Sequence, residues 1–218
     1  MNALIVFVVV YMAVTIAIGL IAARRVHSSK DFMVAGRSLP LYMNVATVFA
    51  TWFGAETVLS VSATFARDGL SGIPGDPFGA TVCLVLVALL FARLFYRMNL
   101  MTIGDFYKHR YGKSVEIVTS LAIVVSYLGW TSAQLTALGL VIYTLSGGAV
   151  ELNQAILIGA GVVLIYTIFG GMWSIAFTDL FQTIVIIIGL TLVAFLVGDL
   201  AGGATKVISQ AAADGKFN

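Results

Sequence analysis

An acidic residue inside an apolar run is the first feature of this sequence that could carry chemistry. Glu56 lies near the middle of that run, shortly after Gly54 and directly before Thr57. Glycine lowers helix propensity, and hydroxyl side chains follow at alternate positions, namely Ser60, Ser62 and Thr64. A helix can unwind at such a segment, and the backbone carbonyls that it frees can bind a cation such as sodium. We therefore expect a cation or solute site here.

A second acidic residue, Asp179, stands beside Thr178 and before Gln182 in the first turns of another apolar run. Charged groups at membrane depth are costly and usually face a cavity or a partner. Each acid also has a simpler interpretation. Glu56 could pair with another helix purely for assembly, and Asp179 could be a solvated acid favoured by a helix N-terminus.

The composition indicates an integral membrane protein. Hydrophobic residues make up 60% of the 218 residues and charged residues only 10%, whereas soluble domains carry about 25% charged residues. The single Cys83 excludes an intrachain disulfide. Zinc spacing, a phosphate loop and a nucleophile motif are not found in the sequence, so we expect neither an enzyme nor a cofactor. The basic residues gather in two short loops rather than along one face, which argues against a nucleic-acid partner.

The apolar runs predict an all-α integral membrane protein with about six transmembrane helices, since about 20 apolar residues cross a bilayer. The first helix covers residues 1–23 and a basic loop covers 24–38. The other five helices lie within residues 39–200, and the segment 201–218 is expected to be an external loop or truncated tail. The five predicted helices are about 39–66, 77–92, 115–145, 154–169 and 175–200.

The distribution of lysine and arginine predicts the orientation of the chain. Two loops that fall on the same side of six spans hold nine of the 12 basic residues. The nine are Arg24, Arg25, Lys30, Arg37, Arg93, Arg97, Lys108, Arg110 and Lys113. We expect this side to be cytoplasmic, which places the N-terminus outside a multi-pass protein of the plasma or inner membrane.

Four segments, taken in order, resemble the sodium:solute symporter family, which contains sodium-coupled sugar, proline and pantothenate transporters. The first is the loop stretch Ser29–Pro40, with its Ala-Gly-Arg-Ser-Leu, and the second resembles the broken second helix of the family. The third is similar to a cytoplasmic loop, and the fourth carries a Gly-Gly pair followed by Thr-Asp and Gln. These last three segments are 50–57, 101–112 and 170–182.

This resemblance implies a leucine-transporter-like fold of two inverted five-helix repeats preceded by one extra helix. The chain would supply the extra helix and the first repeat, and the second repeat is expected to be a missing partner. By motif, the backbone carbonyls of Ala50 and Phe53 would bind sodium, and Glu56 and Thr57 would lie near the substrate. Asp179 would serve cation coupling or gating.

The function that the resemblance implies is secondary transport, in which a sodium gradient drives a small organic solute across the lipid bilayer by alternating access. Sodium would be a co-transported ligand rather than a cofactor. Two alternatives stay open. The chain could be the membrane-embedded input module of a sensor kinase, or a membrane assembly subunit that transports nothing.

Overall fold

Apolar helices make up most of the computed structural model, which describes residues 3–217. Four helices are long and apolar enough to cross a membrane, and a bent pair of shorter ones makes up to five candidate spans. The α-helices are α1 (Ala3–Ala23), α2 (Ser29–Val34), α3 (Leu41–Trp52), α4 (Ser62–Asp68), α5 (Ala80–Val87), α6 (Arg93–Arg97), α7 (Ile103–Tyr111), α8 (Lys113–Leu145), α9 (Leu152–Leu200) and α10 (Ala204–Ala213).

Wider π-helical turns interrupt the second and third apolar runs. One covers Glu56–Val61 and leads into α4, and two others, Pro74–Gly79 and Ala88–Ala92, flank α5. Single π turns inside helices are frequent at functional sites. With these turns included, the third candidate span runs from Pro74 to Arg97, which is longer than the predicted 77–92.

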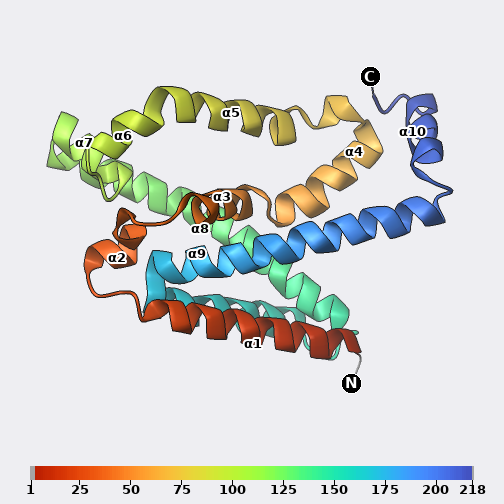
Figure 1. Ribbon diagram of the computed structural model, residues 1–218, viewed down its shortest axis with the longest axis horizontal. Coiled ribbons are helices and arrows are strands. Elements are labelled where there is room, and N and C mark those ends of the chain that lie inside the picture. Colours follow the sequence, from red (N-terminus) through yellow and green to blue (C-terminus); the bar gives the residue numbers. More distant parts are fainter. Residues whose placement is uncertain (1–2, 218) are drawn as a thin grey trace. The chain divides into compact units, whose positions relative to one another are not determined.

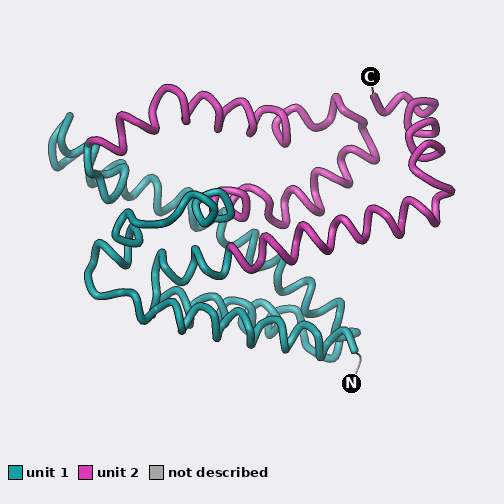
Figure 2. The backbone as a smooth tube through the Cα atoms, viewed as in Figure 1, with its two compact units in different colours: residues 1–47, 98–179 teal, residues 48–97, 180–218 magenta. Residues whose placement is uncertain are grey.

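The chain divides into two compact units, coloured separately in Figure 2. Unit 1 contains residues 1–47 and 98–179, and unit 2 contains residues 48–97 and 180–218. The first unit holds α1, α2, α7, α8 and α9 as far as Asp179. The second holds α4, α5, α6, α10 and the rest of α9.

Small residues let the long helices of unit 1 approach one another closely. A Cβ added at Gly19 of α1 would lie 2.5 Å from the Cβ of Tyr166 in α9. A Cβ at Gly139 of α8 would lie 2.3 Å from Ile156 of α9. Membrane helices gain little from the hydrophobic effect when they associate, so contacts of this kind supply much of their attraction. Gly19 and Gly139 are both buried in these contacts.

The helix α9 is broken at Gly171, where the backbone has φ 48° and ψ −136°. Side chains disfavour this region of the backbone map, and glycine tolerates it. Figure 1 shows the helix turning at the break. The fifth and sixth predicted spans are therefore the two parts of one broken helix, and the second part begins about three residues earlier than the predicted 175.

Buried side chains of unit 1 gather around this break. Ser174 is fully buried, and its hydroxyl donates a hydrogen bond to the carbonyl of Gly19 in α1. The guanidinium of Arg25, just beyond α1, lies 5.0 Å from the ring centroid of Trp173. Gly171 itself packs against Phe32 of α2, so close that an added Cβ would lie 2.4 Å from the Phe32 carbonyl oxygen.

Replacement of Gly171 by alanine is expected to destabilise unit 1 by about 3 kcal/mol, because the backbone conformation there is strained for any side chain and Phe32 leaves no room for a Cβ. The matched control is Gly161→Ala in the same helix, where nothing lies within 4 Å of an added Cβ. That change should keep stability within about 1 kcal/mol of the parent, in the stabilising direction. Thermal unfolding in detergent micelles measures both, and equal melting temperatures for the two variants would contradict the close packing.

Candidate functional site

The apolar run around Glu56 is broken in the structure. Helix α3 ends at Trp52, and the π-helical turn begins at Glu56, so Phe53 and Gly54 lie between two helical segments. The segments Leu41–Trp52 and Glu56–Asp68 meet at an angle of 55°. A bend of this size inside an apolar run changes which backbone groups can bond within the helix.

The carbonyls expected to bind sodium lie at this break. The backbone hydrogen bonds recorded across it run from the Phe53 N–H to the Phe49 carbonyl (2.7 Å) and from the Val58 N–H to the Gly54 carbonyl (3.1 Å). Neither of them uses the carbonyl of Ala50 or Phe53. Both residues are half-buried. Backbone carbonyl oxygens are suitable ligands for a hard cation, and at membrane depth they are acceptable only where they line a cavity or meet a partner.

Hydrogen bonding by Thr57 connects the break to a neighbouring segment of unit 2. Its hydroxyl lies 2.6 Å from Oδ2 of Asp76 and 3.0 Å from the carbonyl oxygen of Trp52. The hydroxyl has a single proton to share between these two acceptors. The Asp76 carboxylate therefore joins the residues predicted near the substrate, although sequence reasoning did not single it out. The signal that could have found it is the breaker cluster Ile73–Pro77, which places a carboxylate between two prolines.

Glu56 lies on an exposed part of unit 2. Within residues 3–217 it takes part in neither of the two ion pairs and in none of the hydrogen bonds between side chains. The interpretation that Glu56 pairs with another helix for assembly therefore finds no partner in the described part of the chain. Glu56 and Asp76 together give this end of unit 2 two carboxyl groups.

Asp179 belongs to unit 1, where it is half-buried in α9 beside the side chain of Thr47. Because the second part of α9 begins just after Gly171, Asp179 lies about two turns inside that helix rather than in its first turn. The field of a helix N-terminus fades within the first turn. A dipole-favoured acid at a helix start is therefore a poor description of Asp179.

The oxygens available at the break are carbonyls, hydroxyls and carboxylates. Among residues 3–217 there is no cluster of three or more His, Cys, Asp or Glu side chains that could hold a metal ion. The donors around Phe53 are instead of the kind that alkali cations accept, because hard cations prefer oxygen ligands.

The loop motifs of unit 1 are helix caps. Ser28 caps α2 by accepting a hydrogen bond from the Asp31 N–H, and Asp31 accepts one from the Ser28 hydroxyl. Thr102 and Asp105 form a reciprocal capping box at the start of α7. Hydrogen bonds from these partners hold the pKa of both Asp31 and Asp105 below the usual range. The pattern of hydroxyl and acid three residues apart thus has a structural reason.

Arg37 connects the two basic loops. Its guanidinium donates to the side-chain oxygen of Asn99 and to the carbonyl of Leu100 (3.3 Å). Arg37 of the first loop therefore contacts residues 99–100 of the second within unit 1.

The chain is similar to known transport proteins. Residues 32–215 match the sodium:solute symporter family. The high-affinity choline transporter 1 of Caenorhabditis elegans is 29% identical over 197 residues, which cover 85% of this chain and 34% of that protein. The sodium/glucose cotransporter of Vibrio parahaemolyticus is 26% identical (89% and 36%), and the human sodium/iodide cotransporter is 28% identical (88% and 29%).

The chain spans about a third of the length of these curated relatives. No solved structure shows significant similarity to it.

The Arg37→Ala variant is expected to lower the melting temperature in detergent and to speed hydrogen exchange around residues 98–103, because two charge-assisted contacts between the loops are lost. Such contacts at a partly exposed site are worth about 1 kcal/mol. Arg110→Ala, which removes an exposed arginine from the second loop, is the control and should leave exchange at 98–103 unchanged. Unchanged exchange in Arg37→Ala would show that the contact does not hold the loops together.

Proposed function

Because the chain belongs to the sodium:solute symporter family, whose members are transporters rather than enzymes, we propose that it forms the N-terminal part of a sodium-coupled secondary transporter for a small organic solute. The observation that carries the proposal is the broken helix at Phe53 and Gly54, which bends a membrane-length segment by 55° and brings Asp76 onto Thr57. Such breaks place carbonyls and polar side chains where an ion and a solute can bind.

In this proposal the carbonyls of Ala50 and Phe53 bind sodium, and Glu56 and Thr57 face the solute. The half-buried Asp76, hydrogen-bonded to Thr57, adds a carboxylate to the solute side. Asp179, inside the second part of α9, serves cation coupling or gating. Differential binding of the ion and the solute to outward-facing and inward-facing states would drive alternating access.

We further propose that transport requires a second five-helix repeat as a partner, so that α1 is the extra helix and the remaining spans form the first repeat of an inverted pair. The support is the family match together with the greater length of the relatives. With the basic loops in the cytoplasm, the protein would be a multi-pass protein of the cell membrane with its N-terminus outside.

Replacement of sodium by N-methylglucamine in the outside buffer should abolish concentrative uptake by the complete transporter reconstituted in vesicles. The physical reason is that the large organic cation cannot take the place of sodium among the carbonyls at the break. The measurement is uptake of candidate solutes from the classes transported by the relatives, with an inward sodium gradient. Uptake that persists unchanged would reject sodium coupling, and sodium-independent signalling without uptake would favour a sensor module.

The Asp76→Asn variant of the complete transporter should raise the KM for solute about tenfold, since a charged hydrogen-bond acceptor contributes about 1.5–3 kcal/mol where it is desolvated. Glu56→Gln should act in the same direction. Asp199→Asn is the matched control, because Asp199 is an exposed acid at the end of α9, and its KM should stay within about twofold of the parent. Equal KM values in Asp76→Asn and the control would remove Asp76 from the proposed site.

A further inference from the structure

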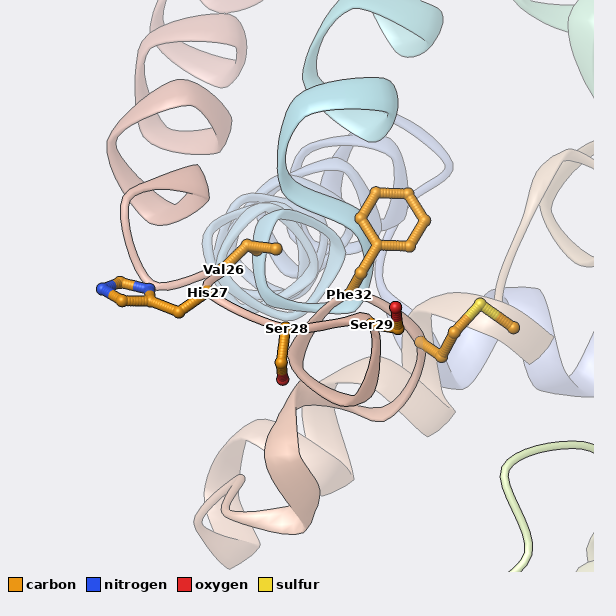
Figure 3. A pocket seen from close by; sticks show the side chains of 6 residues that line it. Val26, His27, Ser28, Ser29 and Phe32 are labelled. Atoms are coloured by element: carbon orange, nitrogen blue, oxygen red, sulfur yellow. The ribbon is translucent and has the colours of Figure 1, made fainter.

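A pocket opens in unit 1 immediately beyond the end of α1. It has a volume of about 650 Å³ and is lined by Val26, His27, Ser28, Ser29, Phe32 and Met33 (Figure 3). The apolar helix α1 is 21 residues long and ends at Ala23. Since about 20 apolar residues cross the hydrocarbon, a pocket that starts three residues later lies at the level of the lipid headgroups.

The lining of this pocket is apolar on one part and polar on the other. Figure 3 shows the ring of Phe32 extending towards a neighbouring helix, while the imidazole of His27 projects in another direction. Met33 is exposed over 46% of its surface. A headgroup with its glycerol and upper acyl carbons needs such a mixed surface, whereas a free inorganic anion does not use the apolar part.

Three basic residues neighbour the pocket-lining residues in the sequence, and Asp31 is the one acid among residues 24–33. Arg24, Arg25 and Lys30 are exposed, and none of them belongs to either ion pair in the described residues. The acid, Asp31, already accepts hydrogen bonds from the Ser28 hydroxyl and the His27 N–H. The segment therefore has an excess of positive charge next to the membrane surface, which attracts anionic lipids at about 1 kcal/mol for each basic residue.

One of these cations is already held in position. The Arg25 guanidinium lies 5.0 Å from the ring centroid of Trp173 and 4.9 Å from that of Phe177. Stacking on two rings restricts the side chain before any ligand arrives, so less conformational entropy is lost when a phosphate binds.

We propose that this pocket binds the headgroup of an anionic phospholipid, with Arg24, Arg25 and Lys30 attracting the phosphate and with Val26, Phe32 and Met33 contacting the glycerol and upper acyl chain. The bound lipid would lie between α2 and the end of α1, next to the Gly171 break. The proposal concerns lipid recognition and is independent of whether the protein couples transport to sodium.

The test uses the 218-residue chain in an uncharged detergent, with lipid binding followed by native mass spectrometry. Phosphatidylglycerol is expected to bind more tightly than phosphatidylcholine with the same acyl chains. The double variant Arg24→Ala, Lys30→Ala should weaken phosphatidylglycerol binding about tenfold or more, because two of the three cations are lost. Both substituted residues are exposed, and circular dichroism checks that the helices are retained.

The matched control is the double variant Arg110→Ala, Lys113→Ala, which removes the same charge from exposed positions of unit 1 outside the pocket. It should change phosphatidylglycerol binding by no more than about twofold. Equal binding of the two lipids by the parent protein would overturn the proposal, because the phosphate charge would not be recognised. An equal loss in both double variants would overturn it as well, because attraction by net charge would then suffice without the pocket.

Discussion

Every backbone carbonyl that leaves a helix inside the hydrocarbon loses its hydrogen-bond donor and finds no water in exchange. This cost explains why nearly all of the apolar sequence is helical and why each interruption deserves a physical reason. Two interruptions dominate the molecule, one at Phe53 and Gly54 in unit 2 and one at Gly171 in unit 1. Both lie within apolar sequence of membrane length, but their surroundings differ.

The Gly171 break is compensated by packing. Ser174 donates to the Gly19 carbonyl, Phe32 covers the glycine, and Arg25 stacks on Trp173. This break is enclosed by protein, and its neighbours include several of the most buried residues of the chain. We interpret this break as a structural turn between two spans, which packing against α1 and α2 stabilises.

The break at Phe53 has a more open and more polar setting. The carbonyls of Ala50 and Phe53 are not used by the hydrogen bonds recorded across it, and a carboxylate reaches it through the Thr57 hydroxyl. Carbonyl oxygens freed at a helix break at membrane depth can bind a cation, which is the physical basis of the sodium proposal. Near Gly171, by contrast, the hydroxyl of Thr178 bonds within the helix.

Periodicity and composition were sufficient to predict the all-helical membrane class, the approximate runs, the weak point at Gly54 and an interruption between residues 169 and 175, because these depend on local propensity and on the solvent. The helices α2 and α7 fall in segments that were predicted as loops, although Ser28 and Thr102 each precede an acid by three residues, which is a capping signal. The contacts of Asp76 with Thr57 and of Arg37 with Asn99 could not be predicted from the sequence. Their partners lie 19 and 62 residues apart, and only the path of the folded chain brings such distant polar groups within bonding distance.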